Sequence, residues 1–291
     1  MVESLDLKHA KKLLPKRKQE SNKATYGKIL NIAGSKFYQG AAALSSLSAL
    51  KIGAGYLTLA CPDCILNNIA SQVPELTFLP LRSYNNESIA GDNALSVAKK
   101  ANEYNVISMG CGLTTNSSTI EFVDTLLNKI DPETKLVIDA DAINALSILE
   151  RSSLPKNSIL TPHPKELSRL LNTSVENICE NRVDSAILAA AKFKSIILLK
   201  GKDTVITDGN IVYINKTGNS GLAKAGSGDV LTGIISGLIS QGMTLLNASI
   251  LGCFIHGLSA DLAAKDLSEY SILATDLINY IPKAINKILG A

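Results

Sequence analysis

The chain has 291 residues, of which 46% are hydrophobic, and a formal net charge of +3. This length can bury a large core, either as one α/β domain or as two smaller ones. The small net charge does not indicate a nucleic-acid-binding protein, and no apolar run of about 18 residues predicts a membrane span. The charged N-terminus lacks an apolar signal core, which favours a cytoplasmic location.

Two local features of the composition suggest function only weakly. The basic run from Lys8 to Lys18 could bind an acidic partner, but a solvated N-terminal segment is the better interpretation. Cys61 and Cys64 have the C-x-x-C spacing, yet no second pair completes a zinc site. Five cysteines in a chain of this length do not suggest a disulfide framework.

Short β-like runs alternate with helix-length segments through the first two thirds of the chain. Repeated strand-then-helix units predict a mainly parallel central sheet with helices on both faces. The expected strands are residues 29–34, 56–60, 105–110, 135–141 and 195–201, and the expected helices are 41–52, 117–130 and a short one ending at 149.

The last third of the chain departs from this alternation. Residues 203–215 read as two strands around an Asp208-Gly209 turn, which predicts a late antiparallel hairpin at one edge of the sheet. Helices are expected over residues 227–241, 244–264 and 275–289. No proline- or glycine-rich linker divides the chain, so we expect a single α/β domain over residues 1–291, with residues 1–25 as an N-terminal extension.

Small and polar residues follow four of the expected strands and the short β-like run that ends before His163. In such sheets, ligands bind beyond the carboxyl ends of the strands. We therefore expect the site to be assembled from these strand ends, which carry Gly34 with Ser35, Gly110 to Gly112, Asp139 with Asp141, His163, and Lys200.

The stretch AGSGD, residues 225–229, lies where an apolar helix is expected to begin. The unpaired amides of a helix N-terminus bind anions such as phosphate, and glycines let the backbone close around them. Asp229 would repel phosphate, but it would serve as a base beside a phosphoryl acceptor. The alternative is a glycine turn with Asp229 as a helix cap. A P-loop motif and a dinucleotide-binding G-x-G-x-x-G after a strand are both missing from the sequence.

Three segments taken together resemble the ribokinase-like superfamily. They are LTPHPKEL, LLKGKDTVI and GNSGLAKAGSGDVLTGIISGLISQG, and with GAAAL near residue 41 they look most like the NAD(P)H-hydrate dehydratases. The resemblance extends over nearly the whole chain. It implies a ribokinase-like fold and the repair of hydrated NADH or NADPH at the expense of ATP or ADP.

The resemblance also implies a mechanism and roles for individual residues. Phosphorylation of the ring hydroxyl would create a leaving group, which the ring nitrogen then expels as phosphate. Asp229 would act on the hydroxyl, while the amides of Gly226, Ser227 and Gly228 would stabilise the moving phosphoryl group. Nucleotide contacts are expected from Lys200, Gly201, Lys202, Asp203, Thr204 and Gly228, hydrated-cofactor contacts from Ala41, Gly112, His163, Asn219 and Asp229, and magnesium binding through water from Glu166.

For several positions, a purely structural role is an alternative to a functional one. Asp139 and Asp141 could bind a metal ion or cap the following helix, and His256 is expected to be a packing residue in an apolar helix. Ser220 and Lys224 replace the proline and threonine common in the family. Lys224 could add positive charge near the phosphates.

Two other functions fit part of the pattern. A small-molecule kinase, such as one acting on hydroxyethylthiazole, would use the same base and anion site, whereas a nucleotide sensor would not need Asp229. The sequence does not distinguish ADP from ATP as the donor. The family suggests a homotetramer. It also suggests a separate NAD(P)H-hydrate epimerase as functional partner, because about 25 residues before the domain are too few to contain one.

Overall fold

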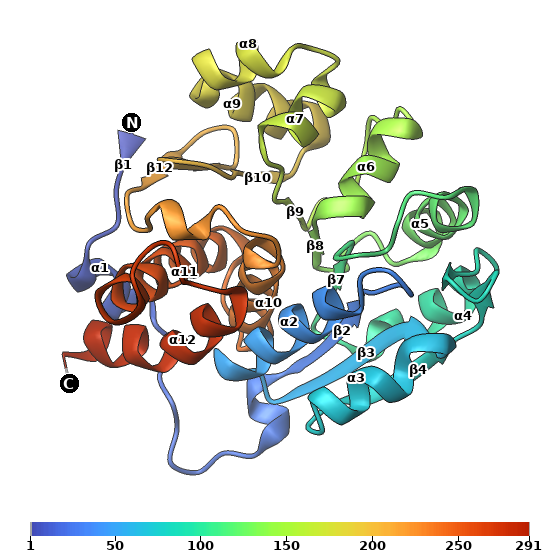
Figure 1. Cartoon of the computed structure of the whole chain (residues 1–291). Helices are drawn as coiled ribbons and strands as arrows, with labels where there is room; N and C mark the ends of the chain where they lie inside the picture. Colours follow the sequence, from blue (N-terminus) through green and yellow to red (C-terminus); the bar gives the residue numbers. More distant parts are fainter. Residues whose placement is uncertain (1, 291) are drawn as a thin grey trace.

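The computed structural model describes residues 2–290. A ten-stranded sheet runs through the molecule (Figure 1), in the order β1-β12-β11-β10-β9-β8-β7-β2-β3-β4. The strands β5 and β6 form a separate two-stranded sheet. The strands are β1 (Val2–Glu3), β2 (Lys28–Ile32), β3 (Tyr56–Pro62), β4 (Thr77–Leu81), β5 (Ser83–Tyr84), β6 (Ser88–Ile89), β7 (Val106–Met109), β8 (Leu136–Ile138), β9 (Ser158–Leu160), β10 (Ile196–Leu199), β11 (Thr204–Thr207) and β12 (Val212–Asn215).

The sheet is mainly parallel, as the alternation of strands and helices predicts. All neighbours from β4 to β10 pair in parallel, and β11 is antiparallel to both β10 and β12. The expected hairpin is therefore present, but it does not end the sheet. Residues 2–3 pair in parallel with β12 and form the edge strand instead. An unpaired strand edge offers backbone donors and acceptors, which the N-terminal segment satisfies here.

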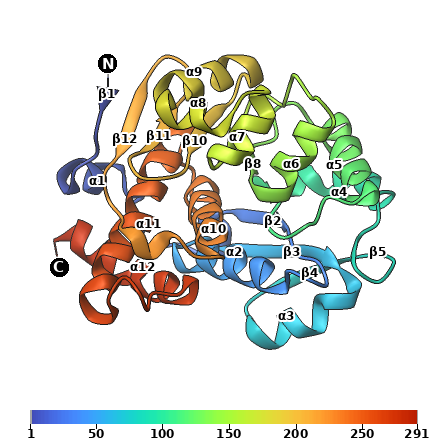
Figure 2. The ribbon, with the colours of Figure 1, turned by 45° about the horizontal axis from the view of Figure 1, so that its top comes forward.

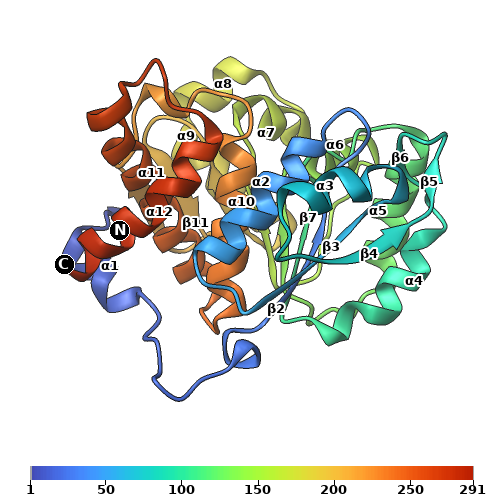
Figure 3. The same ribbon diagram turned by 60° about the horizontal axis from the view of Figure 1, so that its bottom comes forward.

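Helices cover both faces of the sheet (Figures 2 and 3). One buried core lies under α2, α3, α10, α11 and α12, and a second lies under α4 to α9. The α-helices are α1 (Leu7–Leu13), α2 (Gln39–Lys51), α3 (Leu66–Gln72), α4 (Asn93–Lys100), α5 (Ser117–Lys129), α6 (Ala140–Ile148), α7 (Pro164–Leu171), α8 (Val175–Glu180), α9 (Arg182–Phe193), α10 (Ser227–Ser240), α11 (Leu245–Leu267) and α12 (Ala274–Leu289).

Small residues allow α10 to lie directly against α2. A Cβ atom on Gly233 would come within 2.1 Å of the Ser45 carbonyl oxygen, and one on Gly237 within 2.7 Å of the Ala49 carbonyl oxygen. Larger residues would therefore force the two helices apart. This close packing fixes the direction of α10 and places its N-terminus beside the strand ends.

The basic N-terminal segment is not simply solvated. Ala10 in α1 is fully buried, and the Lys11 ammonium donates a 2.6 Å hydrogen bond to the Leu289 carbonyl at the end of α12. A lysine at a helix C-terminus also interacts favourably with the helix dipole. The segment is thus docked on the C-terminal helix.

The helix α11 is apolar and long enough to meet the length criterion for a membrane span. Its most apolar window is, however, 72% buried inside the fold. It packs against α10 and α12 in the core of one face. We therefore interpret α11 as a core helix.

Candidate functional site

The polar residues expected at the strand ends meet at the N-terminus of α10. Asp139 follows β8 and Lys200 follows β10, and both lie beside Gly228 in the first turn of α10. A Cβ atom on Gly228 would lie 3.4 Å from the Lys200 ammonium nitrogen and 3.7 Å from a carboxylate oxygen of Asp139. The glycine therefore leaves space next to a buried cation, where an anion can approach the backbone.

The start of α10 requires a glycine for a separate reason. Gly226 is the N-cap residue, with a φ of 90°. A Cβ atom there would also lie 2.6 Å from Leu44. The Ser227 amide already donates to the Lys224 carbonyl at 3.3 Å, whereas helix geometry leaves the amides of Gly228 and Asp229 without intrahelical acceptors. The amide of Ser227 is therefore less available to a ligand than expected.

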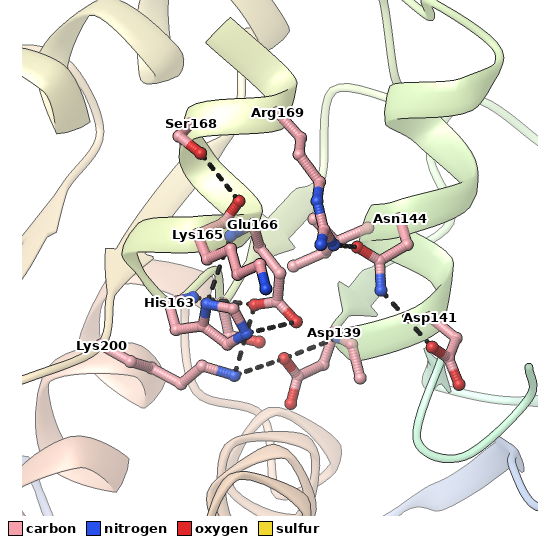
Figure 4. A network of polar contacts seen from close by, with 12 residues as sticks. Asp139, Asp141, Asn144, His163, Lys165, Glu166, Ser168, Arg169 and Lys200 are labelled. Carbon is pink, nitrogen blue, oxygen red and sulfur yellow. Dashed lines mark hydrogen bonds and ion pairs between the residues drawn. The ribbon is translucent and has the colours of Figure 1, made fainter. Parts of the chain in front are cut away.

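A buried ion pair organises the strand ends (Figure 4). The Lys200 ammonium lies 2.7 Å from Asp139 Oδ1, and the Thr232 hydroxyl donates to Asp139 Oδ2 at 2.7 Å. Burial alone would raise the pKa of Asp139, but the charge and hydrogen bonds of Lys200 outweigh burial and lower it. Asp139 thereby links Lys200, which follows β10, to Thr232 in α10. Thr232 lies about one helical turn beyond Asp229.

Asp139 and Asp141 have separate structural roles. Asp139 caps α6 through the Ala140 amide, while Asp141 accepts a 2.8 Å hydrogen bond from the Thr114 amide. Residues 2–290 contain no group of three or more His, Cys, Asp or Glu side chains placed to hold a metal ion. The two aspartates therefore make separate contacts, one at the start of α6 and one to the loop at Thr114.

Replacing Asp139 with Asn should destabilise the protein by about 3 kcal/mol, because the Lys200 ammonium would lose its nearest carboxylate and keep only Glu166, at 3.9 Å. Urea unfolding at neutral pH measures this loss. The double variant Asp139→Asn/Lys200→Met removes both charges and should regain much of the stability. An equal loss in the single and double variants would contradict the role assigned to the pair.

Asp229 lies half-buried in the first turn of α10 and does not cap the helix. The cap position belongs to Gly226, which has no side chain to make a capping hydrogen bond. Burial, together with repulsion from Asp139, raises the pKa of Asp229 to about 6. A carboxylate with this pKa can accept a proton near neutral pH, as a general base requires.

Glu166 and His163 form a capping box at the start of α7. The His163 amide donates to Glu166 Oε2 at 2.8 Å, and the Glu166 amide donates to His163 Nδ1 at 3.2 Å. Glu166 Oε2 also lies 3.9 Å from the Lys200 ammonium (Figure 4). Burial raises the pKa of Glu166 to about 7, and burial with the charge of Lys200 lowers the pKa of His163. Both residues therefore support the helix and face the same cation.

A cavity of about 820 Å³ opens beside this network. Its volume is within the usual range for small-molecule and cofactor sites. His256 lies at its wall and contacts Ser227, and burial lowers the pKa of His256 to about 4. The cavity is lined by most of the predicted ligand contacts, namely His163, Lys200, Gly201, Lys202, Asp203, Thr204, Asn219, Ser227 and Gly228.

Two of the residues expected to contact the hydrated cofactor, Ala41 and Gly112, lie next to each other and are not among the residues that line this cavity. A Cβ atom on Gly112, which has a φ of 67°, would lie 2.9 Å from the Ala41 side chain. Gly112 follows Cys111, and burial together with the charge of Asp229 raises the pKa of the Cys111 thiol. His163, by contrast, lines the large cavity with the expected nucleotide residues. The predicted division of the two ligands, with His163 contacting the hydrated cofactor, therefore stays a prediction.

Asn219 and Lys224 belong to a loop that Asp261 anchors, although no sequence motif singles out this aspartate. Asp261 accepts hydrogen bonds from the Gly218 amide at 2.9 Å and the Asn219 side chain at 3.2 Å. Asn219 also accepts from the Gly221 amide, so its polar groups already stabilise the loop. Lys224 lines the cavity and donates to the Tyr270 carbonyl at 2.6 Å. Asp261 lies in the apolar helix α11, 42 residues from Asn219, and this separation hides the pairing from the sequence pattern.

Known proteins are similar to this chain in both fold and sequence. A solved structure described as a ribokinase-like superfamily protein from Enterococcus faecalis matches with a TM-score of 0.87 at 24% identity, covering 99% of this chain and 96% of that one. The ADP/ATP-dependent NAD(P)H-hydrate dehydratase of Bacillus subtilis, co-crystallised with ATP and Mg²⁺, matches with a TM-score of 0.85 at 31% identity, covering 99% of each chain. The predicted ribokinase-like fold is confirmed.

The chain is also similar to longer proteins. It is 37% identical over 279 residues to a bifunctional NAD(P)H-hydrate repair enzyme of Moorella thermoacetica, covering 94% of this chain and 52% of the relative. The chain thus spans about half the length of that relative. The family model described as NAD(P)H-hydrate dehydratase matches residues 29–283. The chain belongs to the NAD(P)H-hydrate dehydratase family.

Proposed function

We propose that this protein dehydrates the hydrated form of NADH or NADPH in a reaction driven by ATP or ADP. One observation carries the proposal most directly. Asp229, with its raised pKa of about 6, lies in the same helix turn as the anion site that Gly228 and Lys200 form. A base in the same helix turn as a phosphoryl site is what the transfer of a phosphoryl group to a hydroxyl requires.

The proposed reaction has two steps. The ring hydroxyl attacks the terminal phosphorus of the nucleotide, its proton passes to the Asp229 carboxylate, and the shortened nucleotide leaves. The amide of Gly228 and the ammonium of Lys200 stabilise the charge on the moving phosphoryl group. The lone pair of the ring nitrogen then expels phosphate with the former hydroxyl oxygen. Loss of a proton from the adjacent carbon restores the double bond of the dihydronicotinamide.

The site is compatible with a magnesium ion that is bound mainly by water and by the phosphates of the substrate. Magnesium keeps several waters and binds through one or two carboxylates together with substrate phosphates, so a preformed cluster is not required. Glu166 is the carboxylate that the family resemblance implies, and it is buried 3.9 Å from the Lys200 ammonium. Burial raises the pKa of Glu166 to about 7, and a cation bound beside it would favour the ionised form. When bound, Mg²⁺ would neutralise charge on the phosphates.

Several further properties are also proposals. We propose residues 1–291 as a single dehydratase domain in which residues 1–25 form an extension. A homotetrameric state, a cytoplasmic location and an NAD(P)H-hydrate epimerase as functional partner are expectations from the family resemblance. The proposal includes both ADP and ATP as phosphoryl donors.

A small-molecule kinase is the alternative that shares this site. It would use Asp229 and the same anion site but would release a phosphorylated alcohol. Incubation with hydrated NADH and either ATP or ADP, followed by the absorbance of the restored dihydronicotinamide, separates the two. Restored NADH with release of inorganic phosphate supports the dehydratase. Nucleotide consumption with hydroxyethylthiazole but none with hydrated NADH would favour the kinase.

The pH dependence of activity should follow the ionisation of Asp229. Its pKa is raised from the ordinary 3.8 to about 6, so the carboxylate is protonated below about pH 6 and ionised above it. A general base must be ionised, and kcat/KM should therefore fall about tenfold per pH unit below about pH 6. The raised pKa means that the ionised form costs folding stability above pH 6, and this cost is relieved as the pH falls toward 3.8.

Initial rates in buffers of constant ionic strength give the pH profile of the wild type and of Glu166→Gln. Glu166 also has a raised pKa, so this variant identifies its share of the profile. The acidic limb should persist in Glu166→Gln. Its disappearance in that variant would assign the limb to Glu166 instead of Asp229.

A further inference from the structure

His256 contacts the first residue of α10, although the sequence predicts only a packing role for it. Its Nε2 atom lies 3.0 Å from the carbonyl oxygen of Ser227 and 3.3 Å from the Ser227 hydroxyl oxygen. The side chain is buried in α11, yet both His256 and Ser227 reach the wall of the cavity. The ring therefore connects the core helix α11 to the helix start that forms the anion site.

The carbonyl contact determines which ring nitrogen carries the proton. A carbonyl oxygen can only accept a hydrogen bond, so Nε2 of His256 must donate. Burial lowers the pKa of His256 to about 4, and the ring is therefore neutral at neutral pH with a single N–H. That N–H is on Nε2, which leaves Nδ1 without a proton.

The same proton determines the role of the Ser227 hydroxyl. Because Nε2 is a donor, the hydroxyl oxygen can only accept from His256, and its own hydrogen is free to donate elsewhere. The Ser227 amide already donates to the Lys224 carbonyl, so the hydroxyl is the more available donor of this residue. Ser227 lines the cavity beside Gly228, on the side where the helix start would meet a bound anion.

We infer that His256 is a positioning residue that holds the Ser227 hydroxyl as a hydrogen-bond donor to the phosphoryl group in the anion site. The inference rests on the proposed phosphoryl transfer and adds a side-chain donor to the backbone amides of the helix start. Because the donor is preorganised from the core, it does not have to be reoriented when charge develops on the phosphoryl oxygens.

Nitrogen NMR of protein labelled in the histidine rings tests the assigned proton without any assay of activity. The chain has three histidines, and the variants His9→Gln and His163→Gln identify the signals of the other two. The His256 ring should be neutral, with the proton on Nε2, down to about pH 5. A proton on Nδ1, or a ring that is charged near pH 6.5, would overturn the inference. This result does not depend on whether the protein dehydrates hydrated NADH.

A double-mutant cycle tests whether His256 acts through Ser227. Ser227→Ala and His256→Leu should each lower kcat about ten- to a hundred-fold, the scale for loss of a hydrogen bond to a charged group. The double variant should be no worse than the poorer single variant, and His256→Gln, which retains a donor, should recover most of the turnover. Losses that multiply in the double variant, or no recovery with Gln, would overturn the inference.

A matched control separates this role from simple packing. Phe254 is buried in the same helix, and Phe254→Leu should lower the melting temperature while kcat is retained. If Phe254→Leu and His256→Leu lose stability equally and also lose turnover equally, His256 is only a packing residue.

Discussion

Replacing Asp229 with Asn should lower turnover by at least about 100-fold while nucleotide affinity stays close to that of the wild type. The amide has almost the shape of the carboxylate but cannot accept the proton of the substrate hydroxyl. The carboxylate lies in the first turn of α10 next to Gly228, and its pKa is raised to about 6 by burial and by Asp139. Steady-state kinetics and calorimetry with nucleotide measure the two effects separately.

Asp141→Asn is a matched control for this substitution. Asp141 also lies at the strand ends and has a raised pKa, for which burial is the main cause, but its carboxylate accepts the Thr114 amide. It should keep most of the wild-type turnover. Near wild-type turnover in a correctly folded Asp229→Asn protein would show that another group takes the proton.

Replacing Gly228 with Val should weaken nucleotide binding by about a hundred-fold and leave the fold intact. The nearest atoms to a Cβ at this position are the Lys200 ammonium at 3.4 Å and the Asp139 carboxylate at 3.7 Å, so the side chain has room in the unliganded site. It would fill the space in which phosphate must meet the ammonium and the helix amides. The loss of one or two hydrogen bonds to a charged group accounts for the size of the effect.

Calorimetry with ATP and ADP measures the affinity, and the melting temperature reports on folding. Gly228→Ala should have a smaller effect in the same direction, because its side chain fills less of the space. Gly40→Ala is the control, since a Cβ atom at Gly40 would meet no other atom within 4 Å, and it should bind nucleotide as the wild type does. Unchanged affinity in folded Gly228→Val would mean that phosphate is bound elsewhere.

Much of the fold can be predicted from the sequence because its signals are local. Alternating β-like and helix-length segments predict the parallel sheet, and the Asp208-Gly209 turn predicts the hairpin of β11 and β12. The partner of β12 could not be predicted in this way. Pairing of residues 2–3 with β12 joins segments more than 200 residues apart, and a two-residue strand has no periodicity of its own.

The candidate site, like the fold, can be predicted only where its residues are close together in the sequence. The glycines and Asp229 are adjacent in sequence, so their association with the helix start can be inferred from the local pattern alone. The partners of Asp139 lie 61 and 93 residues away, at Lys200 and Thr232. His256 is similar, because an apolar helix around a histidine looks the same whether the ring packs or donates to Ser227. Long-range side-chain contacts of this kind depend on how the helices cross, which the sequence pattern does not specify.

Transfer of phosphate to the hydroxyl of the hydrated cofactor, before that hydroxyl leaves, is the central step of the proposed reaction. The most direct test uses hydrated NADH prepared in water enriched in a heavy oxygen isotope, so that the ring hydroxyl carries the label. After reaction with unlabelled nucleotide in ordinary water, the isotope content of the inorganic phosphate is measured by mass spectrometry. We expect one labelled oxygen in phosphate for each NADH restored. Label found in water, with unlabelled phosphate, would contradict the phosphoryl transfer.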